Sequence, residues 1–456
     1  MKEKDKFILD IKRLGINGEG IGYYNKLAIF VNDAIPGEGV NVEVTKVDKK
    51  MAFAKILEYK KKSPNRIEAQ CPYYKDCGGC NVLHIKYEEM LKLKKDFVIE
   101  SLQRYTNINP KSFEIRETIA SPKIFNYRNK SQVPVRKNLD GNYETCMIKA
   151  KSNELINVKD CLVNDEIIND LNKKILTLAD ELGIPPYLAK YNRGVLRYLS
   201  IRVNKKGEAM VCFICYEKNE KIKELAKRVI ALENVKSVYE NFNNSSKATE
   251  IYGPITNHLE GDIFLIEPIG NVKYQLTPTT FFQLNTLQAE NMFNLVLKAC
   301  KLSKKERVLD AYCGVGAIGL YLAKMAKEVV GIENNPSSVE AAKANAKLNK
   351  INNAKFILGD ATELLPKMLE NNDSFDVIVA DPPRTGLGEN FVDAILNSGI
   401  KRFIYVSCNP STLAKDLELL KQKYNINSIT PLDMFPGSVH VECVAHLTWK
   451  HISDNN

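Results

Sequence analysis

The stretch DAYCGVGAIGLYLA, residues 310–323, joins a predicted strand to a predicted helix. An apolar strand, ERVLDAYC, leads into it, and three glycines follow with the spacing G-x-G-x-x-G: Gly314, Gly316 and Gly319. Glycines in such a turn let the backbone approach a ligand closely at a helix N-terminus, where N–H groups are free to bind it. The stretch therefore predicts a ligand site at the end of a sheet strand.

Strands and helices alternate around this stretch from about residue 271 to the C-terminus. The strand patterns are ERVLDAYC, EVVGIENN, KFILGD, FDVIVADPP, RFIYVSCNP and VHVECVAHLTWK. Helical patterns such as PSSVEAAKANAKLN lie between them. This alternation is typical of a doubly wound α/β sheet, so we expect a Rossmann-like catalytic domain over residues 271–456.

Two further motifs suggest which cofactor this domain takes. Glu333 ends the second strand and is placed to accept hydrogen bonds from ribose hydroxyls, which fits either NAD or S-adenosylmethionine. The fourth strand ends in ADPPR, residues 380–384, a stiff loop that presents oxygen atoms suited to a nucleobase. The chain has five histidines and no histidine pattern typical of hydride transfer. We therefore favour S-adenosylmethionine, with a nicotinamide oxidoreductase as the alternative.

A candidate nucleophile follows the fifth strand in IYVSCNPSTL. Cys408 lies at the same sheet edge, just before a predicted helix whose dipole favours a thiolate. The alternative is a buried packing cysteine. A thiolate that adds to C6 of uracil makes C5 nucleophilic toward a methyl sulfonium, and a base must then remove the C5 proton.

Glu442, in the last strand, is the candidate base for that proton. The alternative is a surface carboxylate on an edge strand. His440 shares its strand parity, and we interpret His440 as a structural histidine.

The N-terminal residues 1–60 form short alternating apolar and polar runs, broken at Asn17-Gly18 and Pro36-Gly37. They predict an OB-like β-barrel of the kind that holds single-stranded nucleic acid, with a small sandwich as the alternative. Residues 61–270 mix a cysteine cluster, further strands and a helix at 87–105 that could pack on either neighbour. We expect a central α+β domain there.

Charge and composition narrow the class of protein. The net charge is +10, from 65 Lys and Arg against 55 Asp and Glu, and basic stretches at 46–66 and 121–137 favour a polyanionic partner slightly. No apolar run reaches membrane-span length, and the first residues lack the apolar centre of a signal peptide. We expect a cytoplasmic monomer without a membrane anchor or a stable protein partner.

At these motifs the sequence resembles the RNA (uracil-5-)-methyltransferase family, most closely its bacterial 23S ribosomal RNA branch. The matching segments are FFQLN (281–285), DAYCGVG (310–316), GIENN (331–335), ADPPR (380–384), SCNPST (407–412) and VHVE (439–442). The resemblance spans essentially the whole chain. It implies that residues 1–60 are a TRAM domain and that the target uridine leaves its stack to reach the active site.

The resemblance also assigns roles by position. It implies that Cys408 is the nucleophile and Glu442 the proton acceptor. The residues that match the S-adenosylmethionine site are Gln283, Tyr312, Glu333 and Asp381. Ala317 stands where some members have an asparagine, so one cofactor contact is missing or replaced.

The segment CPYYKDCGGC, residues 71–80, carries three cysteines with the spacing C-x5-C-x2-C. With eleven cysteines in a chain of cytosolic type, a disulfide framework is not expected, and three thiols need a fourth ligand for a metal site. Cys146, Cys161, Cys212 and Cys215 are candidates. Cys212 and Cys215 are three apart on one strand, where they point to opposite faces, so we expect them in the core.

Spacing alone places zinc ahead of an iron–sulfur cluster, because zinc sites are common. The resemblance reverses this order, since it implies a four-iron four-sulfur cluster held by Cys71, Cys77, Cys80 and Cys161. We expect that site to serve folding or RNA binding.

The favoured reading is thus methyl transfer to C5 of a uridine in 23S ribosomal RNA. A transfer RNA enzyme is the first alternative, although that branch resembles a shorter chain without the barrel and the cysteines. A non-catalytic RNA-binding or ribosome-assembly protein with a vestigial cofactor fold is the second.

Overall fold

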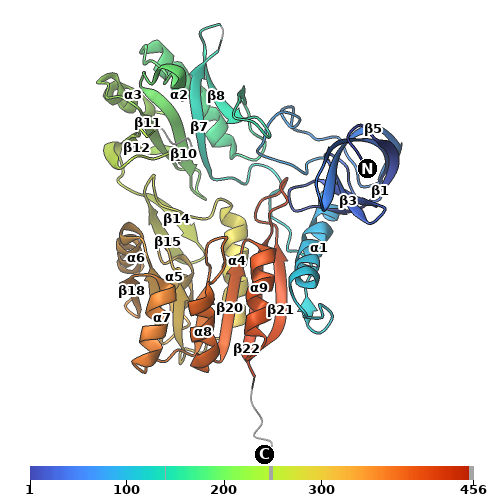
Figure 1. The fold of residues 1–456 in the computed structure, drawn as a ribbon. Coiled ribbons are helices and arrows are strands. Elements are labelled where there is room, and N and C mark those ends of the chain that lie inside the picture. Colours follow the sequence, from blue (N-terminus) through green and yellow to red (C-terminus); the bar gives the residue numbers. More distant parts are fainter. Residues whose placement is uncertain (139, 246–249, 451–456) are drawn as a thin grey trace, which may run out of the picture.

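The computed structural model describes residues 1–138, 140–245 and 250–450, and Figure 1 shows them as three units. A small barrel at the N-terminus stands beside a central sheet and a larger C-terminal α/β domain. Within these described ranges, none of the helices has both the length and the apolar character needed to cross a bilayer.

The N-terminal barrel is closed, with the strand order β1-β2-β3-β5-β4. Its strands are β1 (Lys6–Leu14), β2 (Gly20–Tyr24), β3 (Leu27–Val31), β4 (Gly39–Val47) and β5 (Met51–Lys61). Alternate side chains such as Leu9, Ile29 and Val42 fill its interior at no more than 2% exposure. The predicted β-barrel is confirmed, and turns predicted from glycine occur at Gly18 and Gly37, which have φ of 96° and 85°.

The central domain is a seven-stranded sheet with the order β13-β12-β11-β10-β7-β8-β9. Its strands are β7 (Lys130–Lys137), β8 (Tyr143–Ile148), β9 (Leu155–Asn157), β10 (Leu196–Val203), β11 (Ala209–Cys215), β12 (Val235–Phe242) and β13 (Ile255–Gly261). The helices α2 (Glu166–Glu181) and α3 (Lys221–Ile230) cover one face, and a short 3₁₀ turn spans Ala189–Tyr191. Cys215 packs under these helices and Cys212 in the cluster on the other face, as expected for core cysteines.

The C-terminal sheet has eight strands in the order β18-β17-β16-β19-β20-β22-β21-β6. Its strands are β6 (Glu114–Ile115), β16 (Arg307–Ala311), β17 (Glu328–Glu333), β18 (Ala354–Leu358), β19 (Val377–Ala380), β20 (Arg402–Ser407), β21 (Tyr424–Leu432) and β22 (Glu442–Trp449). Neighbours from β18 to β20 are parallel, and β22 runs antiparallel between β20 and β21. The Rossmann-like methyltransferase fold is thus present.

Helices cover both faces of this sheet, and each face has its own apolar core. The helices are α4 (Thr286–Cys300), α5 (Ala317–Ala323), α6 (Pro336–Leu348), α7 (Ala361–Glu370), α8 (Glu389–Ser398) and α9 (Pro410–Leu420). The first three pack on one face and the last three on the other. This arrangement leaves the carboxyl ends of the parallel strands for a ligand.

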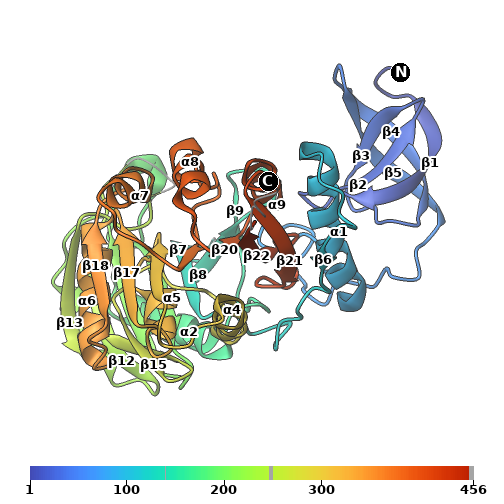
Figure 2. The same cartoon turned by 90° about the horizontal axis from the view of Figure 1, so that it is seen from below.

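The range 61–270 is not one unit in space, because its two ends pack on the C-terminal domain. The helix α1 (Tyr87–Tyr105) buries Val98 and Leu102 in the core of that domain, and Figure 2 shows α1 between the sheet and the barrel. Lys94 of α1 forms an ion pair of 2.5 Å with Asp433, and both side chains are fully buried. The hairpin of β14 (Leu265–Ile269) and β15 (Val272–Leu276) packs on the other face. Sequence periodicity carries no information on these long-range contacts.

Candidate active site

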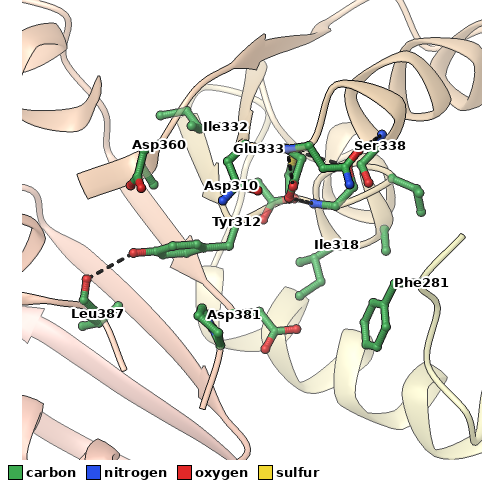
Figure 3. A pocket seen from close by; sticks show the side chains of 18 of the residues that line it. Phe281, Asp310, Tyr312, Ile318, Ile332, Glu333, Ser338, Asp360, Asp381 and Leu387 are labelled. Atoms are coloured by element: carbon green, nitrogen blue, oxygen red, sulfur yellow. Dashed lines mark hydrogen bonds between the residues drawn. The ribbon is translucent and has the colours of Figure 1, made fainter. Parts of the chain in front are cut away.

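A cavity of about 650 Å³ opens where β16, β17 and β19 end, and Figure 3 shows its lining. All four residues predicted to bind the cofactor line it: Gln283, Tyr312, Glu333 and Asp381. They come from four segments that are far apart in the sequence. The parallel sheet brings three of these segments to one edge, as expected for an open α/β sheet.

The glycine loop forms one wall of the cavity. Gly314 and Gly316 have φ of 54° and 76°, in the left-handed region that favours glycine. A Cβ on Gly316 would lie 2.9 Å from the Phe356 ring, whereas a Cβ on Gly314 would meet no atom within 4 Å. Gly316 is therefore needed for packing, and Gly314 leaves open space in which a ligand can approach the backbone.

Glu333 fixes this loop through both of its carboxylate oxygens. Oε2 accepts a hydrogen bond from Gly314 N at 3.0 Å, and Oε1 accepts one from Asn335 N at 2.8 Å (Figure 3). A carboxylate oxygen has two lone pairs, so each can accept a further hydrogen bond. Both oxygens can therefore still accept from a ligand, and the role of Glu333 as an acceptor for ribose hydroxyls stays a prediction.

Two aspartates with unusual acidity lie at the floor and side of the cavity. Burial raises the pKa of Asp381 to about 7. Burial also raises the pKa of Asp310 to about 7, with smaller contributions from the negative charges of Asp381 and Glu333. Asp310 accepts a hydrogen bond from Gly319 N at 2.7 Å and was not predicted as a site residue. An acid inside the apolar strand VLDAY was the signal that could have identified it.

Aromatic side chains complete the cavity. Tyr312 has a φ of 64°, a conformation that costs a non-glycine residue free energy, and its hydroxyl donates to Leu387 O at 3.2 Å. Phe281 is 76% exposed and faces the cavity from the opposite side (Figure 3). Asn129 of the central domain donates to Gln283 O at 2.9 Å and so holds the segment that carries Gln283.

Cys408 lies in a second cavity, of about 200 Å³, next to the first. Arg384 and His440 line it together with Ile16 and Asn17 from a turn of the barrel. The ADPPR motif runs between the two cavities, because its Pro383 lines the first and its Arg384 lines the second. A ligand bound in the first cavity and a nucleobase bound in the second would lie on either side of this loop.

The strand register places Glu442 beside Cys408. Ser407 of β20 is paired with Cys443 of β22 in an antiparallel ladder, so the residues one step beyond this pair are Cys408 and Glu442. Glu442 is only 6% exposed, because β22 lies inside the sheet and not at its edge. The alternative of a surface carboxylate is therefore wrong. Burial, and then the charge of Asp381, raise the pKa of Glu442 well above its ordinary range.

The acidity of Cys408 differs from the expectation based on the helix dipole. The helix α9 does begin just after Cys408, and Asn409 caps it by accepting from Ser411 N. Burial nevertheless raises the pKa of Cys408, the charges of Glu442 and Asp381 raise it further, and Arg384 lowers it. The thiol is half-buried near two carboxylates, and both desolvation and negative charge disfavour the thiolate.

His440 is exposed and forms part of the wall of the Cys408 cavity. Its Nδ1 lies 3.4 Å from Nη2 of Arg384. His440 thus faces the site, as its shared strand parity with Glu442 allowed, and its interpretation as a structural histidine stays a prediction.

The four cysteines of the predicted metal site come together at a third cavity, of about 270 Å³. Cys71, Cys77, Cys80 and Cys161 all line it, whereas Cys146 is fully buried in β8. Burial, followed by the other three thiols, raises the pKa of Cys80 to about 12. In the part of the chain that the structure describes, no three His, Cys, Asp or Glu side chains are arranged to hold a metal ion. The donor set is that of a thiolate site, but its atoms do not surround a single ion.

Comparison with known proteins adds to this geometry. The model of the family described as tRNA (uracil-5-)-methyltransferase matches residues 86–450, and the TRAM domain matches residues 7–57. The chain belongs to the tRNA (uracil-5-)-methyltransferase family. The protein is therefore an RNA uracil-5-methyltransferase that depends on S-adenosylmethionine, as the family match, the relatives and the TRAM domain indicate together.

Relatives of similar length support this family assignment. An uncharacterized RNA methyltransferase of Listeria monocytogenes is 40% identical over 99% of this chain and 98% of its own. One of Clostridium acetobutylicum is 36% identical over 97% of both chains. The solved tRNA (uracil-54, C5)-methyltransferase of Pyrococcus abyssi, in complex with S-adenosyl-L-homocysteine, is 29% identical with a TM-score of 0.76 and covers 97% of this chain and 100% of its own. The expectation that a tRNA enzyme is shorter fails for this family member.

Proposed function

We propose that this protein methylates C5 of a uridine in RNA through a covalent bond between Cys408 and C6 of the uracil. The observation that carries the proposal is the position of Cys408, which lines a cavity that one loop separates from the cofactor cavity and which the strand register places beside the buried Glu442. When S-adenosylmethionine is bound, it supplies the methyl group as an electrophilic sulfonium.

Cys408 acts as the nucleophile once it has lost its proton. Its thiolate forms the S–C6 bond, and the electron pair of the uracil double bond moves to C5, which takes up the methyl group. Arg384 lowers the pKa of this thiol and so offsets part of the cost of burying a negative charge. Cys408 is released when the S–C6 bond breaks and the double bond re-forms.

Glu442 removes the C5 proton that must leave before Cys408 can be released. A carboxylate with a raised pKa is a stronger base than an ordinary glutamate, and the pKa of Glu442 is raised by burial and by Asp381. Its Oε1 is buried and has no hydrogen-bond partner among the described residues, so the protein leaves the acceptor capacity of this atom unused.

For the cofactor, we propose that Gln283, Tyr312, Glu333 and Asp381 bind S-adenosylmethionine, which the open space beside Gly314 and the polar lining support. For the RNA, we propose 23S ribosomal RNA, as the resemblance of the sequence motifs implies. Transfer RNA is the second candidate, because the Pyrococcus abyssi enzyme carries that substrate in its name and covers the whole fold. The barrel turn at Asn17 reaches the Cys408 cavity, so either RNA would contact the barrel and the catalytic domain together.

For the four-cysteine site, we propose that Cys71, Cys77, Cys80 and Cys161 hold a four-iron four-sulfur cluster, with zinc as the less favoured occupant. Four thiols on the wall of a cavity of about 270 Å³ support a polynuclear group over a single ion. Such a group would cross-link segments that are far apart in the chain.

The decisive test maps 5-methyluridine in 23S ribosomal RNA and in transfer RNA, from cells with and without this protein. Loss of one methylated position identifies the RNA. Purified protein is then assayed on that RNA, where Cys408→Ala should abolish methylation and leave cofactor affinity unchanged. Full activity of Cys408→Ala would exclude the covalent route, and no change at any uridine would exclude the proposed reaction.

A further inference from the structure

The segment after the cysteine cluster is tied directly to the loop that leads into the proposed base. Asn81 follows Cys80, and both Asn81 N and Val82 N donate to Gly437 O, at 3.0 and 3.2 Å. The Asn81 side chain adds a third contact, since its Oδ1 accepts from Val439 N at 3.1 Å. The loop at 436–441 is thus bonded to the cysteine segment through backbone and side chain.

The same asparagine also reaches the barrel. Asn81 Nδ2 donates to Asn17 O at 3.0 Å. Asn17 and Val439 both line the cavity that contains Cys408, so Asn81 bonds to two separate parts of the wall of that cavity. A single side chain therefore joins the cysteine cluster, the barrel and the catalytic loop.

Close packing makes this junction stiff. Gly437 has a φ of 83°, and a Cβ there would lie 2.9 Å from Leu83 and 3.5 Å from the sulfur of Cys80. Val82 and Val439 are buried in one apolar cluster that also contains residues of the barrel and of α1. The loop cannot move away from Cys80 without breaking these contacts.

Other contacts, from Tyr127 and from α1, hold Pro436 and the residues before it. The buried hydroxyl of Tyr127 donates to Pro436 O at 3.0 Å. Lys94 donates to Phe435 O at 3.4 Å and to Asp433. Within the loop, Ser438 bonds to Phe435 O and His440 N donates to Ser438 Oγ, and Arg384 contacts His440. Asn81 and Val82 add the bonds that tie Gly437 and Val439, directly before Glu442, to the cysteine segment.

We propose that Asn81 is a positioning residue that couples occupancy of the four-cysteine site to the geometry of the Cys408 cavity. When the thiols hold their metal, Cys80 is fixed, and Asn81 holds Val439 and Asn17 in place on the cavity wall. When the site is empty, the loop at 436–441 loosens and the methyl transfer step slows. The proposal deepens the proposed function and rests on the proposed thiolate site.

The first test separates positioning from folding by steady-state kinetics. Asn81→Ala should lower kcat about tenfold, the effect of one or two lost hydrogen bonds, with KM for S-adenosylmethionine unchanged. Asn81→Asp keeps the acceptor for Val439 N and should recover part of kcat. Asn32→Ala is the matched control, since it removes another polar contact between the barrel and the central domain, to Lys151 at 2.7 Å. An unchanged kcat in Asn81→Ala, or an equal loss in Asn32→Ala, would overturn the proposal.

The second test needs no catalysis and so stands apart from the proposed reaction. The iron, sulfide and zinc contents of the purified protein are measured first. The protein is then loaded with ferrous and ferric iron and sulfide, or with zinc, and is finally stripped with a chelator. Amide hydrogen exchange of residues 436–442 should quicken about tenfold on stripping the wild type, and Asn81→Ala should exchange at the fast rate in both states. The coupling would be refuted if the loaded and stripped wild type exchanged at equal rates, or if stripping quickened exchange in Asn81→Ala as it does in the wild type. It would also be refuted if the wild type retained neither iron nor zinc.

Discussion

We predict that the affinity for S-adenosylmethionine depends on pH through Asp381, which lines the cavity proposed to bind the cofactor and has a raised pKa. Burial raises the pKa of this carboxyl to about 7, whereas an aspartate in an unfolded chain has a pKa of about 4. S-adenosylmethionine carries a positive sulfonium and an ammonium group, so an ionised Asp381 in the cavity wall favours its binding. The perturbation is a change of pH from about 6 to about 8, across this raised pKa.

The size of the effect follows from the ionised fraction. A carboxyl with a pKa of about 7 is roughly 10% ionised at pH 6 and roughly 90% ionised at pH 8, so affinity should rise about tenfold between them. The stability of the folded protein without ligand changes with pH in the opposite direction to the affinity. Because the pKa of Asp381 is higher in the folded protein, its contribution to stability is complete below the pKa of the unfolded chain, about 4, and is lost as the pH rises through about 7. Without ligand, the protein should therefore lose stability over the range in which it gains affinity.

Isothermal titration calorimetry with S-adenosylmethionine at several pH values measures this dependence. Asp381→Asn should bind more weakly at pH 8 and show a flatter profile, with a residual slope from Asp310, whose pKa is also raised to about 7. Asp393→Asn, on the exposed side of α8, is the matched control and should follow the wild type. An affinity that is constant or falls from pH 6 to pH 8 would refute the reasoning, as would a wild-type profile in Asp381→Asn.

Three other predictions concern the base, the glycine loop and the buried ion pair. Glu442→Gln should still transfer methyl but trap a protein–RNA adduct that survives denaturing electrophoresis, since the C5 proton stays; rapid turnover would argue against Glu442 as the base. Gly316→Ala should weaken cofactor binding at least tenfold, because the added Cβ would meet the Phe356 ring. Gly399→Ala, at a similar positive φ but with open space around the added Cβ, should not weaken it, and calorimetry compares the two variants. Lys94→Met should lower the free energy of unfolding by about 3–5 kcal/mol, because it leaves the buried Asp433 without its cation, and should lower the apparent Tm by about 10 °C in a thermal-shift assay. Adding Asp433→Leu to that variant should restore most of the lost stability, and equal losses in the single and double variants would contradict this reasoning.

Local sequence was sufficient for the elements whose signal is contained in one segment. The glycine turns of the barrel, the alternating strands and the motif at Gly314 each report a local backbone requirement, and the structure has the corresponding strands, turns and loop. Asp381, Glu333 and Cys408 were placed correctly at strand ends because the carboxyl ends of parallel strands meet at one edge of a sheet.

Acidity could not be predicted from the sequence, because it depends on neighbours from other segments. The helix that follows Cys408 suggested a lowered pKa, but burial and the carboxylates of Glu442 and Asp381 raise it. Asp310 was overlooked for the same reason, since its pKa is set by desolvation within the sheet. A pKa reflects the whole local environment, of which the flanking residues are a small part.

The sequence by itself determined the class of the fold and indicated S-adenosylmethionine and the candidate site residues, since motifs and periodicity are properties of short segments. Only the tertiary structure decided that β22 lies inside the sheet, that the barrel turn reaches the Cys408 cavity, and that Asn81 joins the cysteine segment to the loop before β22. These features depend on contacts between different segments, which for Asn17 and Asn81 are hundreds of positions away, and such contacts form when apolar surfaces from separate segments are buried together.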